Sequence, residues 1–406
     1  MIQQDVSPPL RFSKFKEDWD QVLFGSFITS RVEYPKLDCN FPLYSLTIEN
    51  GVTPKSARYE RSHLVKSGEK AYKVVYPGDF VSNPMNLRFG AIAKHHGTEK
   101  VLVSKYYDVF HLDSSVITNF VEMYFSTHRT LGFYNSLATG TLDEKKRVHF
   151  SDFVTFKRLF PSIDEQQKIA DFISAVDKKI SLLKEKHSLL EQYKKGVMQK
   201  LFSQEIRFKD ENGNDFPDWE KGILGDLSNK ISNKNKDESV TNVLTNSAKS
   251  GIVSQTDYFK KDIANQSNLG GYSIVEKDDF VYNPRISELA PVGPIKRNHI
   301  GQGVMSPLYT VFRFRDENVL DYLELYFTTT QWHRYMKSIA NFGARHDRMN
   351  ITMGDFFNLP IPVPSKGEME KIVGFIKSLN KKVDLVAEQL NQTKTFKKGL
   401  LQQMFV

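Results

Sequence analysis

The segment EQQKIADFISAVDKKISLLKEKHSLLEQYKKGVMQKLF, residues 165–202, decides the fold because the chain carries it twice. The second copy, EMEKIVGFIKSLNKKVDLVAEQLNQTKTFKKGLLQQMF, occupies residues 368–405. Position 371 minus position 168 gives an offset of 203, and this one offset holds without a gap from Lys168 to Phe202. Identical residues recur throughout the alignment, so the chain contains an internal duplication.

Both copies are predicted to be long helices that pair along an apolar seam. Apolar residues recur every seven positions, a second series follows four residues later, and neither copy contains a proline. At 1.5 Å per residue each helix would be about 55 Å long and would need a partner for its stripe, which we expect to be the other copy. The alternative is that each helix packs only on its own globule. The predicted seam consists of Ile169, Ile173, Val176, Ile180, Leu183, Leu190, Val197, Leu201, Ile372, Ile376, Leu379, Val383, Val386, Leu390, Leu400 and Met404.

The duplication extends upstream of the helices. Asp79-Phe80-Val81 matches Asp279-Phe280-Val281, and Tyr124-Phe125 matches Tyr326-Phe327. Short strand-like runs with Gly, Pro and Asn turns, together with amphipathic stretches at 118–137 and 319–340, predict α+β globules with a curved or barrel-like sheet. The expected order is a first globule at 1–160, a long helix at 161–203, a second globule at 204–363 and a long helix at 364–406.

Bulk composition narrows the class of protein. The 406 residues carry 56 Lys and Arg against 48 Asp and Glu, a net charge of +8 that is compatible with a polyanionic partner. With one cysteine, Cys39, no basic leader and no apolar run of membrane-spanning length, we expect a cytoplasmic protein without a membrane partner.

Partial catalytic motifs do not assemble into a site. SNPMN at 82–86 and YNPRI at 282–286 lack the second proline and aromatic residue of an adenine-methylating loop, so we interpret them as turns. LDEKKR at 142–147 and PDWEK at 217–221 resemble nuclease fragments, but a structural role is favoured. We find no phosphate-binding loop, dinucleotide fingerprint or metal spacing, so a non-catalytic binding protein without a metal site is predicted.

Two divergent globules on a helical spacer match the geometry of duplex DNA. Two protein modules that read one face of a duplex must lie one helical turn apart, about 34 Å, or a multiple of that distance. Arg and Asn side chains in loops are the groups that read guanine and adenine, and Lys binds phosphate. The candidate contacts are Arg88, Lys94, His95, Lys146, Arg147, Asn246, Lys249, Arg285, Lys296, Arg297, Arg345, His346 and Arg348.

The chain resembles the DNA specificity subunit of type I restriction-modification systems. The resemblance rests on PPLRF and the tryptophan after it, FVYNP, GQGVMSPLYTVFRF, the arginine-bearing loop before LPIPVP, and PSIDEQQKIADFISAVDKKI leading into YKKGVMQKLF. The terminal helix departs from the family, with SKGEMEKIV for IDEQQKIA, but keeps its heptads.

The resemblance implies two target recognition domains that read a bipartite asymmetric site in double-stranded DNA, and two antiparallel helices that set the gap. It also implies two methyltransferase subunits, which modify adenine, and restriction and translocase subunits; S-adenosylmethionine, ATP and Mg would belong to these partners, with no cofactor in this chain. The candidate docking residues are Trp19, Lys178, Lys179, Trp219, Lys381 and Lys382. Two alternatives remain open, namely a structural adaptor with duplicated protein-docking surfaces and a stand-alone enzyme acting on nucleic acid.

Overall fold

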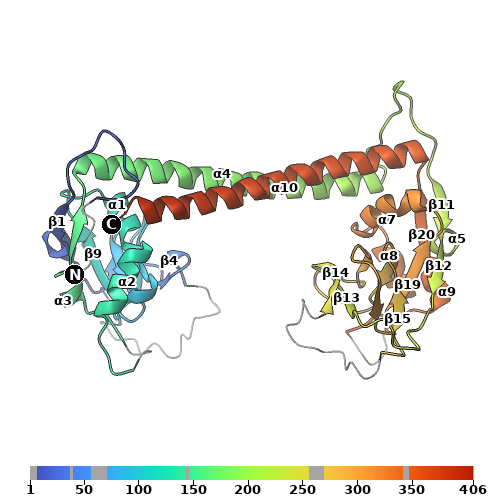
Figure 1. Ribbon diagram of the computed structural model, residues 1–406, viewed down its shortest axis with the longest axis horizontal. Helices are drawn as coiled ribbons and strands as arrows, with labels where there is room; N and C mark the ends of the chain where they lie inside the picture. Colours follow the sequence, from blue (N-terminus) through green and yellow to red (C-terminus); the bar gives the residue numbers. More distant parts are fainter. Residues whose placement is uncertain are drawn as a thin grey trace. The chain divides into compact units, whose positions relative to one another are not determined.

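The computed structural model describes residues 7–36, 40–55, 71–142, 146–255, 269–341 and 347–405. The chain forms two compact units (Figure 1). Unit 1 combines Met1–Glu185 with Ala387–Val406, and unit 2 is Lys186–Val386. Each long helix therefore contributes one end to each unit.

Unit 1 contains a four-stranded antiparallel sheet in the order β2 (Ile28–Ser30), β9 (Asp108–Leu112), β6 (Phe80–Ser82), β7 (Ile92–Lys94). Three further antiparallel pairs surround it. They are β1 (Asp20–Leu23) with β10 (Lys157–Phe160), β3 (Tyr44–Thr47) with β4 (Gly51–Pro54), and β5 (Tyr72–Val75) with β8 (Val101–Ser104).

Unit 2 repeats this topology strand for strand. Its four-stranded sheet has the order β12 (Ser228–Ile231), β19 (Thr310–Phe314), β16 (Phe280–Tyr282), β17 (Ile295–Arg297). The surrounding pairs are β11 (Glu220–Ile223) with β20 (Pro360–Val363), β13 (Leu244–Ser247) with β14 (Gly251–Ser254), and β15 (Ser273–Val275) with β18 (Gly303–Met305). The predicted α+β duplication is confirmed. Among the described residues, the strands of each unit form this four-stranded sheet and three separate pairs rather than the barrel-like sheet that was expected.

Helices complete each unit. In unit 1 these are α1 (Thr118–Phe125), α2 (His128–Leu137), α3 (Phe150–Phe153) and the long α4 (Ile163–Phe202). In unit 2 they are α5 (Leu224–Leu227), α7 (Leu320–Phe327), α8 (His333–Ile339), α9 (Met353–Phe357) and the long α10 (Lys366–Gln403). The single helices expected at 118–137 and 319–340 are each two helices. In unit 1 the break falls at Thr127, whose hydroxyl caps α2 by accepting a hydrogen bond from the Thr130 amide.

Phenylalanine fills both cores. Phe24 lies 5.5 Å from Phe125 and 5.4 Å from Phe153 between ring centroids. In unit 2, Phe280 and Phe312 occupy the corresponding sheet, with centroids 5.9 Å apart. Large rigid rings of this kind bury much apolar area and prefer tilted or edge-to-face contacts, which stabilises a core built on short strands.

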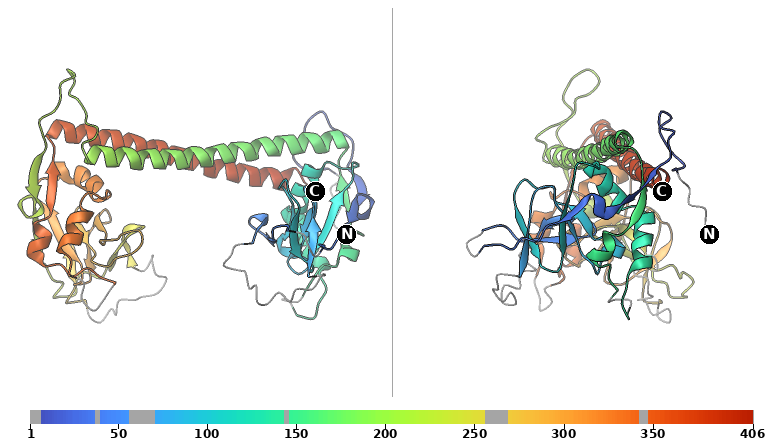
Figure 2. Two further views of the ribbon diagram at one scale, coloured as in Figure 1. Left: turned by 180° about the vertical axis from the view of Figure 1, so that it is seen from behind. Right: turned by 90° about the vertical axis from the view of Figure 1, so that its left-hand side faces the viewer.

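Within unit 1 the first part of α4 lies beside the last part of α10 (Figures 1 and 2). Lys397 Nζ of α10 is 2.6 Å from Asp177 Oδ1 of α4. The entry segment joins them, since the Leu10 amide donates to the Gln403 carbonyl at 3.0 Å. The start of one helix beside the end of the other makes the pairing in this unit antiparallel.

Within unit 2 the last part of α4 lies beside the first part of α10. Lys194 Nζ donates to Asn380 Oδ1 at 3.0 Å. Met198 and Leu201 of α4 belong to the same buried cluster as Ile372 and Ile376 of α10. The pairing is therefore antiparallel here as well.

The seam residues are all shielded, and many of them belong to the cores of the globules as well as to the helix pair. The buried ones are Ile169, Ile173, Val176, Ile180, Leu201, Ile372, Ile376, Leu379, Val383, Val386, Leu400 and Met404. Leu183, Leu190, Val197 and Leu390 are half-buried. Pairing between helices and packing on the globules thus occur together, rather than as alternatives.

Candidate nucleic-acid interface

In unit 2 the Asn-Pro turn after β16 lies against the loop that precedes α9. The Met349 amide donates to the Pro284 carbonyl at 2.9 Å, and Arg285 and Arg348 form an isolated antiparallel bridge. Gly293 has a φ of 79°, and a Cβ there would lie 2.1 Å from the Asn283 carbonyl oxygen. Only glycine allows this close approach. The turn is thereby held where it brings two arginines together.

Unit 1 repeats the same junction. The Val148 amide donates to the Pro84 carbonyl at 3.0 Å, and Arg147 forms a bridge with Thr139. Arg88 lies in the single-turn 3-10 helix Leu87–Phe89 that follows this turn, and its guanidinium is 4.4 Å from the Phe89 ring centroid. The candidate cations Arg88, Lys146 and Arg147 thus come from the same two loops.

The arginines at the unit 2 junction are only weakly paired. Arg285 is 62% exposed at its side chain and lies 4.0 Å from Asp347, while Arg348 lies 3.6 Å from the same carboxylate. One acidic group beside two guanidinium groups leaves net positive charge on this surface. Guanidinium groups can form paired hydrogen bonds with phosphate or with guanine.

The β13–β14 hairpin adjoins this junction. Asn283 Nδ2 donates to the Asn246 carbonyl at 3.0 Å, and Lys249 is exposed in the hairpin turn. Asn246 itself is buried, and its Nδ2 donates to the carbonyls of Val281 and Pro294 at 2.8 and 3.1 Å. The structure therefore gives the Asn246 side chain a framework role, with Lys249 at the surface.

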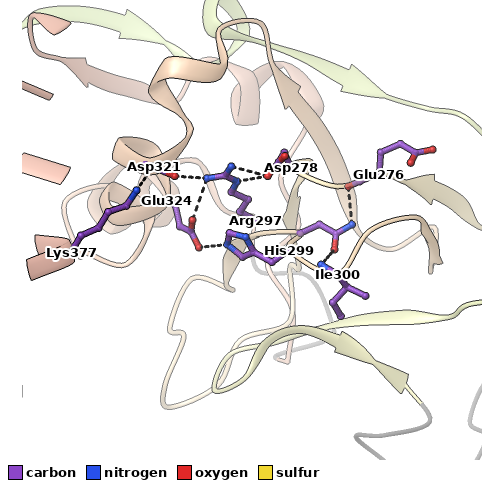
Figure 3. Close-up of polar contacts among 9 residues, drawn as sticks. Glu276, Asp278, Arg297, His299, Ile300, Asp321, Glu324 and Lys377 are labelled. Carbon is purple, nitrogen blue, oxygen red and sulfur yellow. Dashed lines mark hydrogen bonds and ion pairs between the residues drawn. The ribbon is translucent and has the colours of Figure 1, made fainter. Parts of the chain in front are cut away.

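Four predicted contacts lie elsewhere, on or beside β7 and β17. Lys94 Nζ donates to Asn119 Oδ1 at 2.7 Å, and Arg297 donates to Asp278 and Asp321 (Figure 3). His95 is buried, with its Nε2 2.8 Å from the Glu99 carbonyl oxygen. Lys296 is half-buried, and burial lowers the pKa of its amine. These side chains are not gathered with the arginines of the two loops.

Arg345 and His346 lie outside the described residues. In the sequence they lie between Asn341 and Asp347. Their proposed role as DNA contacts stays a prediction.

Among the predicted docking residues, the four lysines Lys178, Lys179, Lys381 and Lys382 are exposed on the long helices. Trp19 is 2% exposed and belongs to the unit 1 core. Trp219 is half-buried and its Nε1 donates to Glu368 Oε2 at 2.8 Å. Both tryptophans therefore hold the entry segments in place.

Sequence reasoning missed a repeated clamp that fixes each entry segment to a long helix. Arg11 donates two hydrogen bonds of 2.7 Å to Glu165 at the start of α4. Arg207 donates to Glu368 of α10 at 3.1 and 2.8 Å. Both glutamates are shielded from solvent. The signal was present, since Glu368 follows Glu165 by the repeat offset and each arginine belongs to a repeated entry motif.

A second missed feature is an exposed apolar stripe on each helix. Leu182, Leu189 and Tyr193 of α4 are 55%, 56% and 54% exposed. Their spacing of seven and four places them on one helical face, away from the buried seam. Leu385 and Phe396 of α10 repeat the stripe at the same offset and are also exposed.

Among the described residues, no group of three or more His, Cys, Asp or Glu side chains could hold a metal ion. None of the helices in the described part of the chain has a long enough apolar stretch to cross a membrane.

This architecture is similar to that of known proteins. Residues 217–395 match the model of the type I restriction modification DNA specificity domain. Three solved structures share the fold over nearly the whole chain. The HsdS subunit of Thermoanaerobacter tengcongensis is 17% identical with a TM-score of 0.51, and 95% of each chain is covered.

The type I restriction-modification S subunit of M. genitalium is 14% identical with a TM-score of 0.50, covering 98% of this chain and 99% of that one. A chain from a structural study of complex assembly and conformational transition of the type I R-M system is 16% identical, with a TM-score of 0.57 and coverage of 95% and 97%. At these identities the structural likeness concerns the fold.

Proposed function

We propose that the chain reads DNA for a type I restriction-modification complex, because residues 217–395 match the model of the type I restriction modification DNA specificity domain and nearly the whole chain has the fold of the specificity subunits compared above. In this proposal the chain is non-catalytic. It recognises a bipartite, asymmetric site and directs adenine methylation and restriction by partner subunits.

The observation that carries the proposal is the junction of two cation-bearing loops, built once in each unit. The same backbone hydrogen bond, to Pro84 in unit 1 and to Pro284 in unit 2, holds both junctions. Two recognition domains of different specificity require the same framework with different loop residues, and the two units have this arrangement. We propose that Arg88 and Arg147 contact one half-site and that Arg285 and Arg348 contact the other. Arg345 and His346, outside the described residues, are proposed to contact the same half-site as Arg348.

The helix pair is proposed to set the gap between the half-sites. At 1.5 Å per residue, the 40 residues of α4 correspond to about 60 Å of continuous helix. That length exceeds the rise of one DNA turn, about 34 Å. Apolar seam residues along both helices resist bending by keeping the partner helix in register.

The exposed stripes support docking of methyltransferase subunits on the helices. In unit 1 a groove of about 410 Å³ is lined by Phe172, Ala175, Val176 and Lys179 of α4 and by Gln392, Thr393 and Phe396 of α10. Apolar groups beside Lys179 suit an amphipathic helix that carries an acidic group. Because the stripe occurs on both helices, we propose that two copies of one methyltransferase subunit dock, one on each. S-adenosylmethionine, ATP and Mg are expected in the partner subunits.

The test is to reconstitute the chain with the methyltransferase subunits encoded beside it and to map methylated adenines on genomic DNA. We expect one bipartite, non-palindromic motif. Replacing residues 20–160 with those of a chain of different specificity should change one half of the motif and leave the other half unchanged.

Two outcomes would contradict the proposal. Methylation without a motif would mean that the chain does not select the site. A stable complex with no methylation and no salt-dependent binding to duplex DNA would favour the adaptor function, because phosphate contacts make affinity fall with salt.

A further inference from the structure

A charged network in unit 2, separate from the proposed DNA interface, centres on Arg297 at the end of β17. Its Nε donates to Asp278 at 2.8 Å and its Nη1 donates to Asp321 at 2.7 Å (Figure 3). A third carboxylate, Glu324, lies 3.6 Å away and pairs with His299 at 2.8 Å. Arg297 is only 12% exposed at its side chain. The network thus ties the edge of the main sheet to helix α7.

The same network reaches the long helix α10. Lys377 Nζ donates to Asp321 Oδ2 at 2.5 Å, so Asp321 accepts hydrogen bonds from the sheet arginine and from the helix lysine at once (Figure 3). Asp321 belongs to α7 and Lys377 to α10. One carboxylate therefore joins the globule of unit 2 to its spacer helix.

Unit 1 begins the same network but lacks its last link. Lys94 replaces Arg297 and contacts Asn119 and Glu122, and Glu122 pairs with His96 at 2.6 Å. Since 320 minus 118 is 202, α1 and α7 align so that Asn119 takes the place of Asp321. Along the long helices the offset is 203, so an exposed Ser174 takes the place of Lys377.

We propose that Asp321 and Lys377 are positioning residues that lock the second recognition globule onto α10, whereas the first globule is held without this charged link. This inference rests on the proposed function. If the proposed function holds, the lock fixes the second globule at one position along α10 while it reads the second half-site. DNA with an altered gap is then methylated less well than it would be without the lock. Lys377 is 63% exposed and Asp321 41% exposed, so salt should weaken the lock.

The experiment uses the complete complex and DNA that carries the mapped motif with its native gap or with the gap changed by one base pair. The variant Asp321→Asn with Lys377→Ser gives unit 2 the pair found in unit 1. We expect methylation at the native gap to be retained, while discrimination against the altered gap falls by about threefold to fivefold. In the wild type, raising salt should reduce discrimination towards the level of the variant.

Two control variants separate positioning from a loss of structure. Lys377→Arg keeps the cation and should retain the discrimination of the wild type. The reciprocal variant Asn119→Asp with Ser174→Lys adds the link to unit 1 and should raise discrimination. The reciprocal variant tests a gain of gap discrimination. It therefore still decides the question if the unit 2 variant proves unstable.

The possible failures are distinguishable. A wild-type complex that methylates without a motif contradicts the proposed function itself. The other failure is a wild-type complex that methylates a specific motif while both double variants show the same gap discrimination and the same salt dependence as the wild type. That result overturns the lock and leaves the proposed function standing.

Discussion

Arg348 and Arg297 show how little the residue type alone says about a role. Both were predicted to contact DNA from loops rich in basic groups. Arg297 donates to two carboxylates and is shielded from solvent, while Arg348 lies beside a single aspartate in the loop junction. Neutralised guanidinium groups stabilise the fold, and cations in excess over local carboxylates can bind an anion. The difference depends on carboxylates that come from distant parts of the chain.

Replacing Arg348 with alanine should weaken DNA binding because it removes a cation from the junction. If Arg348 contacts a base, we expect a loss of about 1 to 3 kcal/mol and relaxed specificity at one position. If it contacts phosphate, affinity should fall evenly across sequences and the salt slope should drop by about one. Binding titrations at several salt concentrations decide between these results. Lys221→Ala, an exposed cation on β11, is the control and should change neither quantity.

Asp321 makes a pH-dependent contribution to unit 2. The hydrogen bond from Lys377 lowers the pKa of Asp321, desolvation opposes this shift, and Arg297 adds to it. A lowered folded-state pKa means that the stabilisation is fully present above the ordinary Asp pKa of about 3.9 and is lost as the pH falls through the lower folded value. Thermal unfolding should be measured from pH 7 to pH 3. At neutral pH the melting temperature of the wild type should be higher than that of Asp321→Asn. The two should converge in acid, whereas a constant difference would contradict the pairing.

At the scale of elements, the long helices combine three surfaces. One face forms the seam, the ends pack into the globule cores, and a third face leaves leucines and aromatic rings in solvent. The heptads made the seam predictable. The exposed stripe could have been found from the spacing of Leu182, Leu189 and Tyr193. It was missed because the heptads of the buried seam are the stronger apolar pattern in the same helix. For the Arg11–Glu165 clamp, the repeat marked both residues, but only the fold shows that they pair, because they lie 154 positions apart.

Leu189→Glu should abolish or strongly weaken binding of the methyltransferase subunit that is proposed to dock on α4, while leaving the fold and the α10 stripe intact. The side chain is exposed, so the substitution breaks no core contact, but a charge in an apolar interface must be desolvated on binding. Ser188→Glu adds the same charge on a neighbouring exposed face and is the matched control. Ultracentrifugation should show a complex that has lost one of its two methyltransferase subunits only for Leu189→Glu. Equal binding by both variants would mean that the partner docks elsewhere.

At the scale of the whole molecule, two units with their own cores share two helices. The cores do not merge, since the described buried clusters around Phe80 and Phe280 have no member in common. Stability should therefore respond locally to a core substitution, although the chain passes from one unit to the other within the two long helices.

Phe280→Ala and Phe80→Ala form a matched pair that tests this independence. Each removes a fully buried ring and should destabilise its own unit by about 3 to 5 kcal/mol. Hydrogen exchange should quicken at 220–363 for Phe280→Ala and at 20–160 for Phe80→Ala. Faster exchange in both units for either variant would show that the chain unfolds as one cooperative body.

The sequence by itself determined the duplication, the two long helices with their apolar seam, and the α+β class, because local periodicity and self-similarity are written along the chain. The antiparallel direction of the helices was implied only by the family resemblance. It also predicted the family resemblance that the comparisons confirm. Only the tertiary structure decided which basic residues are neutralised and which are gathered in the loop junctions. The reason is physical: charge neutralisation and burial depend on partners far apart in sequence, such as Lys377 and Asp321, and no local pattern encodes that distance.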